Sequence, residues 1–312
     1  MKNRLLVIRF SSIGDILLTA PVICELKEAG HHITLLVKSR FKSTALLLYG
    51  IDVVLCWEES MEEILHGSVH NFDRAIDLQG TAQSKRFTNK LGIPTETFKK
   101  PYVRRVLLIA TKNKRYALTP VVHRYAQASG VVLKSKEIKF NIKARALWRD
   151  KPVLVIGGTK SGKRLNIQQW LQIISGLPQQ KAVLLGGPAD QKTALEIIAT
   201  FPECKNATQT SVEEGMAIIQ ESKLVVSGDT GFMHAAALMG VPLVSLWGAT
   251  HPSLGFGPWP ARANQHCLIT SAPSPRSKHG NVPFYATNPM LSLDINEIQN
   301  VIAGILQDRT KP

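Results

Sequence analysis

The sequence predicts an α/β protein made of two halves, each a mostly parallel sheet with helices between its strands. Short apolar runs alternate with helical patterns over residues 4–78 and again over 153–247, which is the order of parallel α/β sheets. A polar stretch rich in lysine and arginine separates the two series at 142–151. We therefore place a domain boundary there, giving domains 1–149 and 150–312, and expect the two sheets to face a central cleft.

The first half contains four apolar runs with the length of buried strands. We predict strands at 4–10, 32–38, 52–57 and 74–78, and helices at 16–27, 44–48 and 61–65. Pro21 falls inside the first helical pattern, so we expect a kink or a later helix start, because proline has no amide N–H. Residues 104–111 and 123–128 form further elements whose type the pattern does not decide.

The second half repeats the alternation. We predict strands at 153–156, 182–185, 224–228 and 243–247, and helices at 167–174, 190–200, 212–220 and 231–238. A region rich in proline, glycine, serine and asparagine follows at 251–289 and is expected to be mostly loop. A helix at 294–307 ends this pattern, with Asp294 as its cap. In proteins with two such halves a terminal helix can pack back across the first half, and that arrangement is left open here.

Composition limits the classes of protein to consider. With 312 residues, of which 44% are hydrophobic and 20% charged, the chain is globular. The sequence shows no apolar run that could span a membrane and no signal peptide. Its four cysteines form no zinc or disulfide pattern. We therefore expect a protein of the reducing cytosol. A net charge of +15 indicates a polyanionic partner (nucleic acid, anionic lipid or a phosphorylated substrate). Solvated basic helix faces are the alternative, but a charge this one-sided favours a functional patch.

The stretch 224–238 is the clearest candidate for binding. An apolar strand ends at Gly228, the polar turn Asp229–Gly231 follows, and small apolar residues then continue as a helix. Open α/β sheets bind ligands at the carboxyl ends of their strands, and the N–H groups that begin a helix bind anions. The turn alone leaves two interpretations open, since Asp229 or Thr230 can equally be a plain helix cap.

Other turns also follow predicted strands. Asp15 comes after such a turn and can act as a general base, although the turn alone favours an aspartate that only stabilises a helix start.

Residues 157–164 are glycine-rich and cationic, so their N–H groups and Lys163 can hold phosphates. Arg164 stands where a P-loop needs Ser or Thr, and no GxGxxG follows the first strand, which weakens the NTPase and NAD interpretations. Asp190 is as well suited to a ribose as to capping the next helix.

Together these turns resemble glycosyltransferase family 9, the bacterial heptosyltransferases of lipopolysaccharide core assembly. The segments that carry the resemblance are 9–21, 77–80, Gly158–Thr159 with Lys163 and Trp170, 226–231 with His234, and 245–250. They are collinear with the family from about residue 4 to about residue 260. The resemblance implies a GT-B fold, with 1–149 as the acceptor-binding Rossmann-like domain and 150–312 as the one that binds a nucleotide sugar.

The resemblance also implies a reaction. It is an inverting, metal-independent transfer of a heptose or related sugar, usually from ADP-heptose, to a Kdo or heptose of a phosphorylated, lipid-anchored lipopolysaccharide core. The enzyme would be cytoplasmic and peripheral, acting at the inner face of the cytoplasmic membrane. No cofactor is expected. No DxD pair supports a metal-bound donor, and the lone histidines His66, His70, His123, His266 and His279 lack metal-ligand spacing.

Residue roles follow from the same resemblance. Asp15 is the general base that takes a proton from the acceptor hydroxyl, and Lys163 stabilises the leaving diphosphate. The donor-binding positions are Thr159, Asp190, Asp229, Thr230, Gly231 and His234. The acceptor-binding positions are Asp77, Gln79, Arg104 and Arg105. The two arginines, with Lys112 and Arg115, are also candidates for contact with an anionic leaflet.

Two alternatives belong to other classes of protein. A non-catalytic protein that binds a nucleotide sugar or lipopolysaccharide on the same scaffold would bind the donor without releasing ADP. An intact Asp15 and Lys163 argue against it, because a binding module needs no base. A nucleic-acid-binding protein rests on charge alone, since the sequence shows no RNP motif, zinc module or basic helix with heptads.

Overall fold

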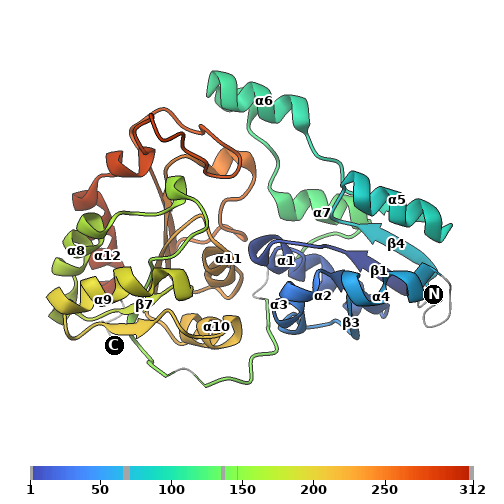
Figure 1. Ribbon diagram of the computed structural model, residues 1–312, viewed down its shortest axis with the longest axis horizontal. Coiled ribbons are helices and arrows are strands. Elements are labelled where there is room, and N and C mark those ends of the chain that lie inside the picture. Colours follow the sequence, from blue (N-terminus) through green and yellow to red (C-terminus); the bar gives the residue numbers. More distant parts are fainter. Residues whose placement is uncertain (1–2, 66–70, 135–137, 146, 309–312) are drawn as a thin grey trace. The chain divides into compact units, whose positions relative to one another are not determined.

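The buried apolar runs of the sequence form the strands of two parallel sheets (Figure 1). The computed structural model describes residues 3–65, 71–134, 138–145 and 147–308. By its tertiary contacts the chain divides into unit 1, which is Met1–Pro101 with Thr119–Ile142, and unit 2, which is Tyr102–Leu118 with Lys143–Pro312. The chain therefore leaves unit 1 for unit 2 at residue 102, returns to unit 1 at residue 119, and belongs to unit 2 from residue 143 onward.

Unit 1 contains a five-stranded parallel sheet in the order β3-β2-β1-β4-β5. Its strands are β1 (Arg4–Ile8), β2 (His32–Val37), β3 (Val53–Cys56), β4 (Arg74–Asp77) and β5 (Thr95–Thr97). Its helices are α1 (Ile13–Leu17), α2 (Ala20–Glu28), α3 (Lys42–Leu46), α4 (Trp57–Leu65), α5 (Ala82–Leu91) and α7 (Val121–Ser129), with the 3-10 turn η1 (Ser39–Phe41). The central strand β1 is buried from Leu5 to Ile8, as expected of a strand covered on both faces.

Pro21 has the predicted effect on the helix after β1. The chain forms two helices, and Pro21 lies in the first turn of the second, α2, where its missing N–H leaves no intrahelical bond unmade. The first helix, α1, is consequently short and keeps Asp15 in its first turn, directly after the carboxyl end of β1. Asp15 thus belongs to a separate short helix beside the end of the central strand.

Unit 2 contains a six-stranded parallel sheet in the order β11-β10-β9-β6-β7-β8. Its strands are β6 (Pro152–Val155), β7 (Val183–Leu185), β8 (Lys205–Ala207), β9 (Leu224–Gly228), β10 (Leu243–Trp247) and β11 (Gln265–Ile269). Its helices are α6 (Tyr102–Thr111), α8 (Ile167–Ser175), α9 (Gln191–Thr200), α10 (Val212–Gln220), α11 (Gly231–Leu238) and α12 (Ile295–Asp308). Its 3-10 turns are η2 (Lys114–Tyr116), η3 (Ser161–Lys163), η4 (Pro178–Gln180), η5 (Pro188–Asp190), η6 (Pro252–Leu254) and η7 (Pro289–Ser292). The fold class predicted from the sequence, α/β with two Rossmann-like parallel-sheet domains, is confirmed.

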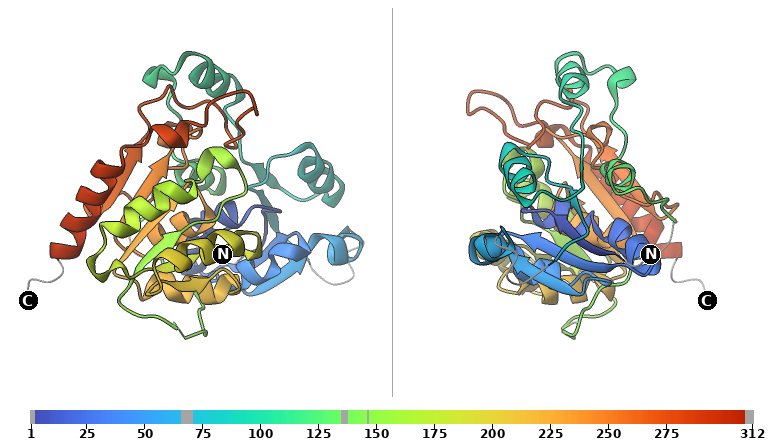
Figure 2. Two further views of the ribbon diagram at one scale, coloured as in Figure 1. Left: turned by 60° about the vertical axis from the view of Figure 1, so that its left-hand side comes forward. Right: turned by 90° about the vertical axis from the view of Figure 1, so that its right-hand side faces the viewer.

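The helices of unit 2 cover both faces of its sheet. Helices α8, α9 and α12 share one face, where Trp170, Ile173 and Ile298 belong to the same buried cluster (Figure 1). Helices α10 and α11 pack against each other, and α11 packs on β9 and β10. The terminal helix thus adds to the core of unit 2, beside α8 in Figure 1 and Figure 2.

Several elements differ from the prediction. Strands β5, β8 and β11 were not expected, and residues 104–111 and 123–128, whose type the pattern left undecided, lie in helices α6 and α7. The boundary in the chain falls at 142/143 in place of 149/150, and residues 102–118 group with unit 2. Among the residues that the structure describes, no helix is both long enough and apolar enough to cross a bilayer.

Candidate active site

The carboxylate of Asp15 lies at the carboxyl end of β1, where neighbouring groups fix its orientation. The guanidinium Nη2 of Arg9 is 2.7 Å from Oδ2 of Asp15. The Ser12 N–H and hydroxyl also donate to this oxygen, over 3.3 and 3.2 Å. The side chain of Asp15 is still 22% exposed, so a substrate hydroxyl can reach it.

Arg9 is buried at the end of the central strand. Its Nη1 donates to the carbonyl oxygen of Leu78 over 2.8 Å, so one guanidinium ties the turn after β4 to the carboxylate after β1. It also lies 5.6 Å from the ring centre of Tyr125, on α7. Burial by itself lowers the pKa of Arg9, but the adjacent Asp15 carboxylate outweighs burial and the pKa is raised. Arg9 is thus a fixed cation that orients Asp15.

Tyr125 completes this buried cluster from α7. Its side chain is fully buried and packs edge-on against Phe98, with 4.9 Å between ring centres. Burial raises the pKa of its hydroxyl, so the phenol stays neutral beside Arg9 and Asp15. Tyr125 therefore supports the position of the Arg9–Asp15 pair and adds no charge to it.

The carboxylate of Asp77 stabilises the turn after β4. The carboxylate is fully buried, Oδ1 accepts from the N–H groups of Gln79 and Gly80, and Oδ2 accepts from the Ser84 hydroxyl. Burial raises its pKa, and these hydrogen bonds act in the opposite direction. The oxygen of the Gln79 side chain accepts from the Phe10 N–H. The predicted contact of Asp77 and Gln79 with an acceptor stays a prediction, and the structure shows these oxygens holding the turn.

In unit 2, Lys163 and Asp229 form a second buried ion pair at the carboxyl ends of β6 and β9. Lys163 Nζ lies 2.7 Å from Asp229 Oδ2, and the two side chains are mostly buried. His234 Nε2 is 3.9 Å from the other carboxylate oxygen. A side chain at Gly228 would collide with the carbonyl of Lys163, so glycine is what lets the lysine-bearing turn approach the strand end.

The predicted helix cap is at Thr230. Its hydroxyl accepts from the Met233 N–H over 3.3 Å and lies 2.9 Å from the Ser227 hydroxyl, so it begins α11. Asp229 does not cap the helix but faces Lys163. The first N–H groups of a helix lack intrahelical partners, so α11 presents donors and a positive dipole end beside the Lys163 ammonium. That combination suits a diphosphate.

Asp190 lies next to the glycine-rich turn. Its Oδ2 accepts from the Gly187 N–H over 2.9 Å, and Oδ1 is 3.5 Å from Arg164 Nη1. A side chain at Gly157 would strike this carboxylate, so the strand end and Asp190 are closely packed. Thr159, in the same turn, is exposed. Both stay candidates for donor contact.

The comparisons with known proteins identify the family. The profile of glycosyltransferase family 9 (heptosyltransferase) matches residues 22–282. The chain belongs to this family. The chain is 22% identical to lipopolysaccharide heptosyltransferase 1 of Escherichia coli K12 over 295 residues, covering 81% of this chain and 91% of that protein.

Two solved structures have the same fold. The structure of E. coli ADP-heptose LPS heptosyltransferase II superposes with a TM-score of 0.75 at 19% identity, over 98% of this chain and 99% of that one. E. coli heptosyltransferase WaaC with ADP gives 0.71 at 19% identity, over 97% and 99%. The family 9 chain described here is thus a glycosyltransferase with the GT-B fold.

The structure divides the predicted residues of this family 9 enzyme between two groups. Asp15, Asp77 and Gln79 belong to unit 1, whereas Lys163, Asp190, Asp229, Thr230 and His234 gather at the strand ends of unit 2. Arg104 and Arg105 lie on α6 and group with unit 2, although the prediction placed them in the acceptor domain. The Arg104 guanidinium donates to the carbonyls of Ala117 and Arg115, which holds η2 against α6.

Sequence reasoning missed three contributors to these sites. Arg9 had a signal, since an arginine directly after a fully apolar strand needs a buried partner. Tyr125 and Gly280 had none, because their contacts arise only from the tertiary fold. Gly280 lies so close to the Lys163 side chain that an added Cβ would be 2.6 Å from its Cγ. Within the described ranges no group of three or more His, Cys, Asp or Glu residues could hold a metal ion. His66 and His70 lie outside those ranges.

Proposed function

We propose that this chain transfers a heptose or a related sugar from an ADP-sugar to a lipopolysaccharide core acceptor, with inversion and without a metal. The observation that carries the proposal is Asp15, a partly exposed carboxylate in a family 9 enzyme that Arg9 and Ser12 hold in one orientation. The curated relatives are lipopolysaccharide heptosyltransferases, and one structural neighbour at a TM-score of 0.68 is WaaC with ADP-2-deoxy-2-fluoro heptose.

In the proposed reaction Asp15 removes the proton from the acceptor hydroxyl as that oxygen attacks the anomeric carbon of the donor. The bond from this carbon to the diphosphate breaks on the opposite side, so a single displacement inverts the anomeric configuration. The nucleoside diphosphate leaves with the bonding electrons. Base catalysis of this kind typically contributes about 100- to 10,000-fold in rate.

The residues of unit 2 would stabilise the leaving diphosphate. Lys163 supplies a cation, and the N-terminus of α11 at Thr230 and Gly231 supplies N–H donors and the dipole. Asp229 is placed to accept hydrogen bonds from sugar hydroxyls once the donor competes for Lys163. A fixed ammonium and a helix N-terminus together provide the charge that other transferases take from a divalent cation, and this supports the metal-independent proposal.

The donor can be identified by thermal protection. Binding raises the unfolding temperature in proportion to the logarithm of ligand concentration over Kd, so a panel of ADP-, GDP- and UDP-sugars should single out the ADP-sugar. ADP release on adding a heptose-containing core acceptor then tests transfer, and unchanged release in excess EDTA tests metal independence. Protection without release would favour the non-catalytic alternative, and protection by a UDP- or GDP-sugar alone would overturn the proposed donor. Because the acceptor is anchored in lipid, we place the enzyme at the cytoplasmic face of the inner membrane.

A further inference from the structure

One face of helix α6 is apolar and exposed. The apolar stripe, defined as Tyr102, Val103, Val106 and Leu107, has exposed fractions of 56, 75, 62 and 37%. Positions i, i+1, i+4 and i+5 of a helix project to one side, so the four side chains form a continuous strip. Large apolar side chains gathered in this way mark an interaction surface.

The opposite face of α6 is already engaged within unit 2. Leu108 is buried and, with Ile109, packs on Leu118, Leu254 and Phe256. The Arg104 hydrogen bonds to Ala117 and Arg115 fasten the following turn to the helix. The helix therefore does not need the apolar stripe in order to fold onto unit 2, and the stripe is available to a partner.

The charge around the apolar stripe has one sign. Residues 97–136 contain no aspartate or glutamate. The cations that lie on α6 or close to it in the sequence are Lys99, Lys100, Arg104, Arg105, Lys112, Lys114 and Arg115. Arg105 stacks on the Tyr102 ring, with 4.8 Å from its guanidinium carbon to the ring centre, and Arg115 stacks on Tyr116 at 4.6 Å. An apolar strip bordered by arginine, lysine and tyrosine is the composition of helices that lie in the interface of an anionic bilayer.

A second exposed apolar feature lies at the same end of unit 2. Phe284 and Tyr285 are almost completely exposed, and their rings meet edge-on with 5.4 Å between centres. The segment that carries them, which is orange to red, and α6 are both at the top of Figure 1 and of the left view in Figure 2. Lys278 and Arg276 belong to the same segment. Aromatic side chains are enriched at the bilayer–water interface.

We propose that the apolar stripe of α6 inserts into an anionic lipid surface and that the flanking cations bind its phosphate headgroups. Phe284 and Tyr285 provide a second point of insertion. The proposed function enters only as the reason for docking, because a lipid-anchored acceptor has to be reached at the bilayer. The docking itself depends on α6 and not on the identity of the sugar.

Vesicle binding tests this proposal directly. The full chain is sedimented with vesicles of phosphatidylglycerol and phosphatidylethanolamine, or of phosphatidylcholine alone. We expect binding to the anionic vesicles that is much weaker on phosphatidylcholine and declines with salt, because screening acts on the cations. The double variant Val106→Ser/Leu107→Ser should bind at least tenfold more weakly.

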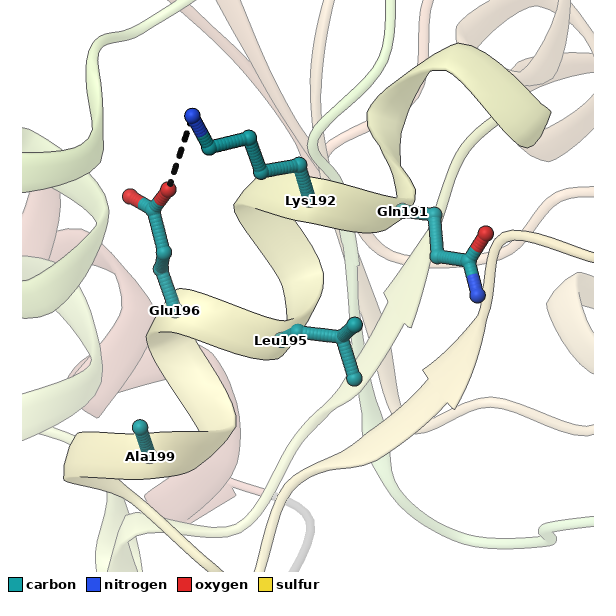
Figure 3. A pocket seen from close by; sticks show the side chains of 5 residues that line it. All are labelled: Gln191, Lys192, Leu195, Glu196 and Ala199. Carbon is teal, nitrogen blue, oxygen red and sulfur yellow. Dashed lines mark ion pairs between the residues drawn. The ribbon is translucent and has the colours of Figure 1, made fainter.

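The helix α9 offers a matched control. Leu195 is 53% exposed there, beside Lys192 and Glu196, which pair with each other at 3.9 Å, so that face has no excess of positive charge (Figure 3). Leu195→Ser should bind vesicles like the unchanged protein. Absence of binding by the unchanged protein, or equal loss in both variants, would overturn the proposal. The proposal would also be overturned if the α6 variant changed its oligomeric state but still bound vesicles. In that case the apolar stripe would contact a second copy of the chain.

Activity separates this proposal from the proposed function. Protection by ADP and transfer to a water-soluble, delipidated core sugar should be the same in the α6 variant and the unchanged protein. Transfer to the same sugar embedded in anionic vesicles should fall at least tenfold in the variant. If no nucleotide sugar protects any form, the proposed function fails, while the vesicle measurement still decides the role of α6.

Discussion

Arg9 and Asp15 form a 2.7 Å ion pair between the residue that follows the central strand of unit 1 and the first turn of the next helix. The arginine side chain is 8% exposed and the aspartate 22%, so the cation is sealed in while the carboxylate faces solvent. A buried cation holding a partly exposed carboxylate fixes the direction of the oxygen that has to accept a proton. This relationship is the basis of the first two predictions.

Asp15→Asn should greatly slow transfer and leave donor binding intact. The amide cannot accept the proton, so we expect kcat to fall about 100- to 10,000-fold. Thermal protection by the ADP-sugar should persist, since the donor-binding residues lie in unit 2. Asp52→Asn is a matched control, because Asp52 pairs with Lys27 in the same unit and has no assigned role. Turnover retained by Asp15→Asn would contradict its assignment as the base.

Arg9→Lys should separate orientation from charge. Lysine keeps the positive charge, but its single nitrogen cannot span both the Leu78 carbonyl and the Asp15 carboxylate as the guanidinium does. A base displaced by about 1 Å costs roughly 100-fold in rate, so kcat should fall by about that factor while KM for the donor is unchanged. Steady-state kinetics with each substrate varied in turn makes the measurement. If KM for the donor rose by a factor as large as the fall in kcat, the substitution would have destabilised the protein in general.

Gly280→Ala should act on Lys163 from the loop region that follows β11. Gly280 has φ +81°, and an added Cβ would lie 2.6 Å from Cγ of Lys163. The backbone strain should lower the free energy of unfolding by about 1–2 kcal/mol. The displaced lysine should also weaken ADP binding, which calorimetric titration with ADP measures.

Gly92→Ala separates the two effects of the Gly280 substitution. Gly92 has a similar φ of +65°, but nothing lies within 4 Å of an added Cβ. This control should lose comparable stability and bind ADP normally. If both variants bind ADP equally well, the loop does not position Lys163.

Sequence patterns located the elements whose residues are uniformly buried. β1 and β9 are runs of buried apolar residues and were predicted within two residues of their observed ends. Strands β5 and β8 were missed because Thr95–Thr97 and Lys205–Ala207 are short and mostly polar. The type of α6 was undecided because residues 102–111 mix an apolar run with Arg104 and Arg105, and only Leu108 among them is buried, so they show no repeating core face.

The functional turns were predictable, but the contacts between them were not. The position of Asp15 and Lys163 after strand ends follows from local patterns and the family resemblance. The pairing of Lys163 with Asp229 joins two strand–turn segments that meet only when β6 and β9 become neighbours in the sheet. For Asp77, the position in a strand-end turn indicated a contact with a ligand. In the structure its oxygens accept hydrogen bonds from the turn itself.

His251 should make the stability of unit 2 depend on pH. Its Nδ1 accepts from the Ser253 N–H over 3.0 Å, and the Ser253 carbonyl accepts from the Leu118 N–H over 2.8 Å. The imidazole therefore supports the turn that binds Leu118, the last residue of the segment 102–118. Burial, with the nearby charge of Lys114, lowers the pKa of His251 below its ordinary 6.5. The folded state therefore favours the neutral ring, which alone can accept at Nδ1.

The sign of the pH effect follows from that lowered pKa. Because the unfolded chain binds the proton more readily, the stabilisation is complete above about pH 6.5 and is lost as the pH falls through the lower value of the folded state. Urea unfolding between pH 7.5 and 4.5 should show the loss, at about 1.4 kcal/mol for each unit by which the pKa is lowered. His251→Asn keeps an acceptor for the Ser253 N–H but does not titrate, so its free energy of unfolding should lack this component. His123→Asn, at an exposed position on α7, should keep it. Identical pH profiles for the unchanged protein and His251→Asn would show that the imidazole does not couple protonation to the folding of this turn.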